Sequence, residues 1–309
     1  MLLTGRQCPL GLVGVFVFFT ISGYLVTGSW LSTGSAWRFA LKRCLRILPG
    51  LWVNLLVVGL VLGPAVSTLP FSAYLASPRL AEFFGNNLAF SAVDTPLPGV
   101  LFADSPTGLV VNGALWTLRY EMLMYAMVLL LGVARVLWLW VCLALVAAGV
   151  AGILFEVPLT PYGDFGEWAW LVGFFATGMA LRLAGPRWLD LRLALVAAIG
   201  LVASVELRLF IPLFPVFGSY LTIYLAERHV RRLDVLGRAG DLSYGLYIYG
   251  WPIEQAVVWA TGGKAAWWQV FLLSMAAALP VAFLSWHGVE KRALRLLRAR
   301  AVVAIEAGK

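Results

Sequence analysis

The chain has 309 residues, of which 61% are hydrophobic and only 12% are charged, and its formal net charge is +8. These proportions exclude an ordinary soluble domain and indicate an integral membrane protein. Because a transmembrane helix needs about 20 apolar residues, the chain has room for many spans. We therefore expect an all-α, polytopic bundle that forms a single membrane domain over residues 1–309, with no appended soluble domain.

Apolar runs predict nine transmembrane helices in chain order. They lie near residues 11–31, 47–65, 116–134, 136–155, 167–185, 191–207, 208–227, 241–261 and 266–287. Basic residues fall in alternate gaps, at 38–46, 135, 182–192, 228–238 and 291–309, which the positive-inside rule assigns to the cytoplasm. The other gaps contain acidic residues and are assigned to the outside: Glu82, Asp94, Asp104, Glu156 and Asp164. The C-terminus is then cytoplasmic, and an odd number of spans leaves the N-terminus outside.

Neither the net charge nor the cysteines indicate a nucleic-acid partner or a metal site. Cytoplasmic loops that face anionic lipid account for most of the positive charge, so we expect membrane lipids as partners and no nucleic acid. Cys8, Cys44 and Cys142 are too few and too scattered for a disulfide framework or a metal site. We expect no bound metal.

A basic segment, 38–56, leads into the second span. Arg43 and Arg46 are three residues apart and would project from one face of a helix at the cytoplasmic border. Paired guanidinium groups suit phosphate or pyrophosphate, which coenzyme A carries. Taken in isolation, the same pair is more typical of an anchor for anionic lipid headgroups.

The longest stretch between spans, 66–115, is rich in proline and small polar residues, and we interpret it as an external loop. Within it, residues 72–90 are moderately apolar but contain Pro78, Arg79 and Glu82. This part is expected to lie at the interface or to enter the membrane only partway.

The third span begins with two charged residues, Arg119 and Glu121. A charge inside the bilayer is costly, so such residues usually face the interior of the bundle or a water-filled cavity. Glu121 and Tyr125 are one helical turn apart and share a stripe, whereas Trp116 precedes Arg119 by three residues. The alternative is an interfacial position, in which Arg119 reaches out to water and Glu121 is solvated. Ser243, Tyr244 and Tyr247 in the eighth span could line the same cavity or bond across helices.

Four segments, in this order, resemble motifs of the acyltransferase 3 family. They are GVFVFFTISGYLV at 14–26, KRCLRILPGLW at 42–52, LWTLRYEMLMY at 115–125 and LGRAGDLSYGLYIYGWPI at 236–253. The first contains Gly14, Val15, Phe18, Phe19, Ser22, Gly23 and Tyr24, and the last contains Ser243, Tyr244, Tyr247, Trp251 and Pro252. Each motif is weakly specific alone, but four in this order are fairly specific, and the resemblance extends over nearly the whole chain.

The resemblance implies a membrane acyltransferase that moves an acyl group, often acetyl from acetyl-CoA, onto a cell-envelope carbohydrate or a related acceptor. It implies that Arg43 and Arg46 hold the acyl donor and that Glu121 belongs to the catalytic core. Acyl-CoA would be a co-substrate, and no cofactor would stay bound. The partner would be a carbohydrate or lipid-linked glycan, and the location a bacterial cytoplasmic (inner) membrane.

The sequence departs from the family pattern at the catalytic base. In the family this base is usually assigned to a histidine on a helix before the first motif, and Gly250 occupies a second position where the family often has histidine. One upstream helix would also give ten spans with both termini inside, so we expect a late start codon or a natural fragment. His229 and His287 are expected to be solvated and interfacial, respectively. The alternatives to an active enzyme are a transporter or flippase and an inactive relative.

Overall fold

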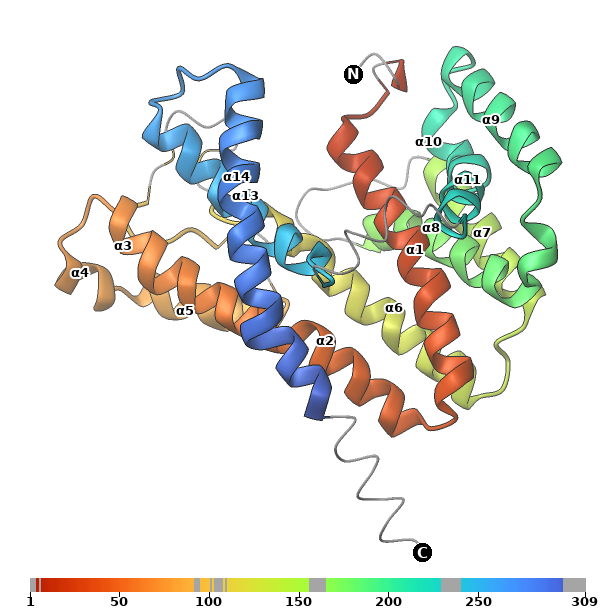
Figure 1. Cartoon of the computed structure of the whole chain (residues 1–309), viewed down its shortest axis with the longest axis horizontal. Coiled ribbons are helices and arrows are strands. Elements are labelled where there is room, and N and C mark those ends of the chain that lie inside the picture. Colours follow the sequence, from red (N-terminus) through yellow and green to blue (C-terminus); the bar gives the residue numbers. More distant parts are fainter. Residues whose placement is uncertain are drawn as a thin grey trace, which may run out of the picture. The chain divides into compact units, whose positions relative to one another are not determined.

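The computed structural model describes residues 4–5, 7–91, 95–100, 102, 108, 110–155, 165–228 and 240–296, with side chains of α8 described from Trp170 onward. Across these ranges the secondary structure is helical, apart from an isolated antiparallel bridge between Ser67 and Val100 (Figure 1). The expectations for Asp94, Asp104, Glu156, Asp164 and His229 lie outside the described residues, as do those for the basic residues in 231–238 and 298–309.

The chain divides into two compact units. The first combines Met1–Ala40 with Tyr120–Val230, and the second combines Leu41–Arg119 with Arg231–Lys309. Two of the boundaries fall inside helices, namely α2 (Ala36–Val57) and α6 (Trp116–Val133). Each unit is therefore assembled from separate stretches of chain and is not one of two domains in tandem.

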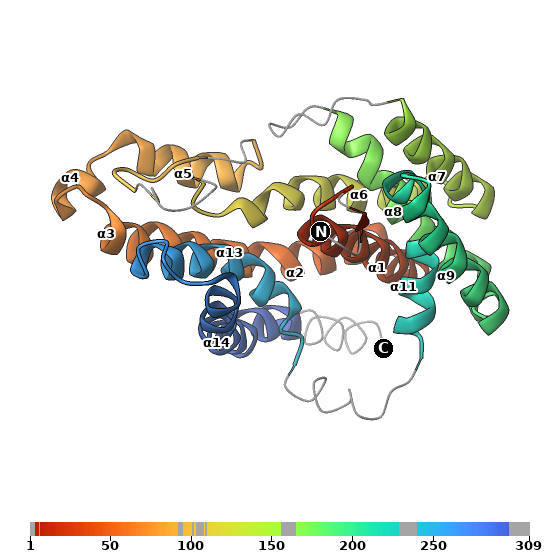
Figure 2. The same cartoon turned by 90° about the horizontal axis from the view of Figure 1, so that it is seen from above.

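The first unit contains α1 (Leu10–Thr33), α7 (Leu139–Leu154), α8 (Phe165–Ala184), α9 (Leu191–Glu206), α10 (Phe210–Leu213) and α11 (Phe217–Ala226). Helix α8 packs against both α1 and α7, while α11 packs against α1, α8 and α9. Figures 1 and 2 show these helices side by side from two directions. The core of this unit therefore lies around α8.

Small residues let α1 and α8 approach closely. A Cβ atom on Gly23 would lie 2.0 Å from the carbonyl oxygen of Phe175, and one on Gly178 would lie 2.1 Å from that of Thr20. The Thr20 hydroxyl lies 2.7 Å from the hydroxyl of Ser219 in α11. Membrane helices associate through such close packing and through interhelical hydrogen bonds, because lipid provides no hydrophobic driving force.

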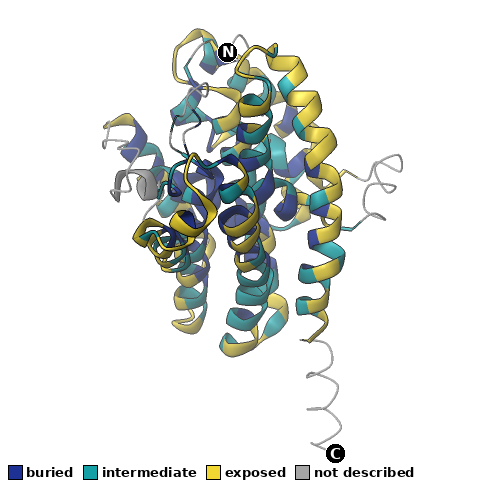
Figure 3. Ribbon diagram, turned by 90° about the vertical axis from the view of Figure 1, so that its left-hand side faces the viewer, coloured by how far each residue is buried: buried dark blue, intermediate teal, exposed yellow. Residues whose placement is uncertain are grey.

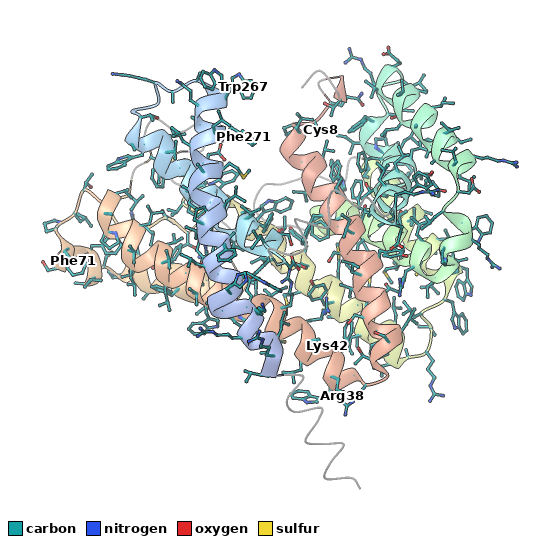
Figure 4. The ribbon with its side chains drawn as sticks, in the orientation of Figure 1. Cys8, Arg38, Lys42, Phe71, Trp267 and Phe271 are labelled. Atoms are coloured by element: carbon teal, nitrogen blue, oxygen red, sulfur yellow. The ribbon has the colours of Figure 1, made fainter. Side chains whose placement is uncertain are left out.

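The second unit contains most of α2, then α3 (Gly63–Val66), α4 (Phe71–Leu75), α5 (Pro78–Leu88), α13 (Ser243–Ala260) and α14 (Trp267–Ser285). Helix α13 packs against α14. Much of α14 is exposed along its length (Figure 3), and its first turns carry Trp267 and Phe271 on the surface (Figure 4). An exposed face made of large apolar residues is expected for a helix in contact with lipid.

A π-helical turn over Val58–Leu62 joins α2 to α3. The Gly63 backbone N–H donates to the carbonyl of Val58, five residues earlier, so the Gly59 carbonyl loses its ordinary helical donor. Tyr74 replaces that donor, and its hydroxyl lies 2.6 Å from the Gly59 oxygen. Burial raises the pKa of the Tyr74 phenol to about 12. This hydrogen bond fixes α4 against the end of the α2 segment.

All nine predicted segments are helical, at least in part. By length and composition, four helices of the described part are able to cross a membrane: 10–33, 36–66, 113–133 and 267–296. Three shorter apolar helices are 139–154, 170–184 and 217–226. Two boundaries differ from expectation. Helix α2 begins at Ala36, so the basic segment is already helical, and the predicted span 208–227 is interrupted between α10 and α11, where Pro215 lacks a backbone donor.

Candidate functional site

Arg46 lies in a network of charged side chains in the second unit. Its Nη2 atom is 2.7 Å from Oδ2 of Asp241, and its Nη1 atom is 3.3 Å from Oε2 of Glu290. The Glu290 side chain is fully buried, whereas that of Asp241 is about half exposed, at 49%. One guanidinium therefore bridges two carboxylates in different surroundings.

Two serines complete the hydrogen bonds of these carboxylates. The Ser285 hydroxyl donates to Oε1 of Glu290 at 2.9 Å, and the Ser243 hydroxyl donates to Oδ1 of Asp241 at 2.5 Å. Glu290 ends a π-helical turn over Trp286–Glu290 that continues α14. Because buried charges need both a counter-ion and hydrogen bonds, the network has the partners that make burial of Glu290 tolerable.

Aromatic rings flank the Arg46 guanidinium. Its central carbon lies 5.6 Å from the centre of the Tyr244 ring and 5.8 Å from that of the Trp286 ring. The Tyr244 hydroxyl donates to the Ile47 carbonyl at 2.8 Å, which ties α13 to α2. Contacts between a cation and a ring at these distances are attractive and add to the orientation of the guanidinium.

The structure thus brings together three of the residues that the sequence indicated separately: Arg46, Ser243 and Tyr244. Arg43 lies one turn before Arg46 on the same helix and is partly buried. Asp241 and Glu290 are functional candidates that sequence reasoning missed. With these two carboxylates around it, Arg46 is electrostatically compensated, so an anionic ligand would have to compete with a carboxylate for its donors.

Helix α6 carries the second group of predicted residues. The side chain of Glu121 is buried, with the residue only 5% exposed, and its carboxylate accepts a hydrogen bond from the Tyr125 hydroxyl. The predicted shared stripe is confirmed, and the alternative of a solvated Glu121 is wrong for this structure. In the second unit, Trp116 and Arg119 line a small pocket together with Leu51, Asn87, Phe90, Leu115 and Leu118. Its volume of about 10 Å³ has room for no more than about one water.

Tyr247 anchors the segment that leads into α6. Its hydroxyl donates to the Ala114 carbonyl at 2.6 Å and also contacts the hydroxyl of Thr117. One turn later on α13, Pro252 has no N–H for the Ile248 carbonyl, and Asn54 and Asn112 donate to that oxygen instead, each at 2.9 Å. The contacts with Ala114 and Thr117 give Tyr247 a structural role, which the sequence alone left open.

Comparison with known proteins decides the family. The chain matches the acyltransferase 3 family model, described as an acyltransferase domain, over residues 2–287. It belongs to the acyltransferase 3 family. A protein of Shigella phage Sf6 named O-acetyl transferase is 28% identical over 304 residues, which cover 92% of this chain and 85% of the relative. Nodulation protein 10 of Rhizobium leguminosarum bv. viciae is 28% identical over 318 residues, which cover 92% and 82%, respectively. No solved structure matches the chain.

For a member of the acyltransferase 3 family, the described residues offer two chemical groups: a compensated cation at Arg46 and a buried carboxylate and phenol at Glu121 and Tyr125. His287 contributes to neither group. Its Nδ1 atom lies 3.0 Å from the Phe283 carbonyl, and its ring packs on that of Phe283. No cluster of three potential metal ligands occurs among the described residues.

Proposed function

We propose that this protein is a membrane O-acyltransferase that moves an acyl group, in particular acetyl, from acyl-CoA to a hydroxyl of a cell-envelope carbohydrate or related acceptor. The observation that carries the proposal is the family match over residues 2–287, which is strengthened by the phage relative named O-acetyl transferase. The apolar helices support an integral membrane location, for which we propose the bacterial cytoplasmic membrane.

The reaction replaces one acyl bond by another. The acceptor hydroxyl oxygen attacks the thioester carbonyl carbon, a C–O bond forms, the C–S bond breaks, and coenzyme A leaves as a thiolate. The hydroxyl proton passes to a base and the thiolate finally takes up a proton, so the reaction consumes no net proton. Catalysis requires a base within hydrogen-bond reach of the hydroxyl and a site that holds both substrates.

We assign the acceptor side of this chemistry to Glu121 and Tyr125. The carboxylate is buried and already accepts a hydrogen bond from the phenol, so its orientation is set before substrate binds. Such a carboxylate can accept the proton of a sugar hydroxyl or hold that hydroxyl in place. A carboxylate within a membrane-spanning helix is energetically costly, and such residues usually mark a functional site.

The acyl-donor side is assigned to Arg43 and Arg46. Phosphate groups of coenzyme A would compete for the donors that Arg46 now gives to its carboxylates. Asp241 is the exchangeable partner because it is half exposed, while Glu290 is buried and stays in place as a support. A guanidinium held by one carboxylate and one phosphate uses both of its terminal nitrogens.

A transfer assay tests the proposal. Membranes that contain the protein receive labelled acetyl-CoA, and label in the envelope polysaccharide fraction of the same cells is counted. Glu121→Gln should lower transfer by about 100-fold or more, which is the usual contribution of a general base. The matched control is Glu82→Gln, which removes an exposed carboxylate of α5 and should leave transfer unchanged.

Other outcomes would redirect the assignment. Normal transfer in Glu121→Gln would remove the acceptor-side site, although not the acyltransferase activity. Substrate flux that does not need acetyl-CoA would favour a transporter. Binding of acetyl-CoA without any transfer by the unmodified protein would favour an inactive relative.

A further inference from the structure

The first unit contains an apolar groove that none of the proposed chemistry uses. Its volume is about 460 Å³, which is within the range of about 300–1,000 Å³ typical of ligand pockets. It lies among α7, α8, α9 and α11, and its walls are almost entirely apolar. Each of the four helices contributes to the lining of the groove, for example through Leu143, Leu181, Val196 and Phe217, respectively.

One end of the groove is polar and aromatic. Trp188 and Tyr220 both line it, and the Tyr220 hydroxyl donates to the Trp188 carbonyl at 2.7 Å. The same hydroxyl accepts from the Asp190 backbone N–H at 3.2 Å, so the turn between α8 and α9 is fixed to α11. Trp188 is 51% exposed. Tryptophan and tyrosine at the end of an apolar surface are typical of the membrane–water interface.

Positive charge gathers at this same end. Arg187 and Arg192 are exposed and directly precede Trp188 and Leu193, which both line the groove. A third arginine, Arg228, contacts the groove indirectly. Its guanidinium lies 4.4 Å from the ring centre of Tyr224, and that ring stacks on Tyr220, which lines the groove. The positive-inside rule alone explains basic residues at a helix end. It does not explain an apolar groove that ends among them.

We propose that this groove is a specific site for an anionic phospholipid of the bilayer. One acyl chain lies in the groove, and the phosphate headgroup lies among the arginines beyond Trp188. The groove matches a hydrocarbon chain because its walls offer almost no polar atoms, and the rim matches the headgroup in charge. Each basic residue near an anionic headgroup contributes about 1 kcal/mol, which corresponds to about fivefold in affinity.

The test is lipid binding to the full chain in detergent, followed by native mass spectrometry. Phosphatidylglycerol is compared with phosphatidylcholine of the same acyl chains. The unmodified protein should bind its first phosphatidylglycerol molecule at least about tenfold more tightly than its first phosphatidylcholine molecule. In Arg187→Gln/Arg192→Gln this preference should fall by about 25-fold, because Arg228 alone remains at the headgroup, whereas phosphatidylcholine binding should stay unchanged.

A pair of matched variants tests the groove itself. Val196→Trp fills the groove from an exposed position of α9 and should weaken binding of both lipids. Ile199→Trp changes an exposed residue of the same helix that does not line the groove, and it should leave binding unchanged. Because both positions are exposed, neither substitution disturbs the core.

Four results would overturn the proposal, three from lipid binding and one from the oligomeric state. The three binding results are equal affinity for the two lipids in the unmodified protein, unchanged lipid binding in Val196→Trp, and competition by a soluble glycerophosphate headgroup that is as strong as competition by the intact lipid. The last result would indicate a simple anion site. A dimer that forms in place of a lipid complex would likewise show that a second chain covers the groove.

Discussion

Replacing Arg46 by methionine keeps most of the side-chain stem but removes the guanidinium from Asp241 and Glu290. Glu290 would then remain as a fully buried carboxylate. It would lose its hydrogen bond to Arg46 and keep the one from the Ser285 hydroxyl. The two contacts differ in their expected contributions. The contact with half-exposed Asp241 is worth about 0.2–1 kcal/mol, whereas breaking a buried pair costs about 3–5 kcal/mol.

Because the Arg46 side chain is itself 20% exposed, we place the loss for Arg46→Met near the lower end, at about 3 kcal/mol. Thermal unfolding in detergent measures this loss as a fall in Tm of about 5 °C or more. The double variant Arg46→Met/Glu290→Gln should recover most of it, because glutamine carries no charge and can still bond to Ser285. Asp241→Asn serves as the control and should change Tm only slightly.

A value of Tm for Arg46→Met that equals that of the unmodified protein would refute the reasoning, as would a double variant no more stable than the single one. Transfer activity of the double variant then separates two roles of Arg46. If the arginine binds the acyl donor, the double variant is stable but has a raised KM for acetyl-CoA. If the network is only structural, transfer returns together with stability.

Three further predictions concern packing and the π-helical turn. Gly178→Ala should lower Tm because its Cβ would lie 2.1 Å from the Thr20 carbonyl oxygen, whereas Gly14→Ala, with nothing within 4 Å, should not. Tyr74→Phe should cost about 1 kcal/mol in unfolding by denaturant, because the Gly59 carbonyl loses its donor. Since the Tyr74 pKa is raised from 10.0 to about 12, its contribution is complete below pH 10 and is lost as the pH rises through 12. The alkaline fall in Tm should therefore be smaller in Tyr74→Phe, and equal falls would contradict the assignment.

The helices could be predicted from the sequence because apolar runs of the right length have few alternatives in a membrane. The residues at which the helices begin and end could be predicted less well. Arginine and lysine are good helix formers, so α2 starts at Ala36, well before its apolar part begins. The π-helical turns were not predicted, because they depend on contacts such as that of Tyr74 with Gly59, which are not local to the helix that bulges.

The site could be predicted only in pieces. The spacing of Glu121 and Tyr125 is local, so their hydrogen bond was within reach of sequence reasoning. The carboxylate partners of Arg46 could not be predicted from the sequence, because they are 195 and 244 residues away along the chain. Glu290 stands among basic residues near the end of the last helix, where a carboxylate would ordinarily be interpreted as solvated. Its full burial depends on how α14 packs within the second unit.

The π-helical turn at Trp286–Glu290 also sets the register of the helical residues 291–296 that follow it. Such a turn accommodates one residue more than an α-helical turn, and one residue corresponds to about 100° of rotation around the axis. Deleting Gly288 would remove this extra residue without removing any side chain. The helix would continue as regular α-helix, and the Glu290 carboxylate would turn away from Arg46 although both residues remain present. A substitution scan of this segment cannot detect that dependence, whereas a change of length can.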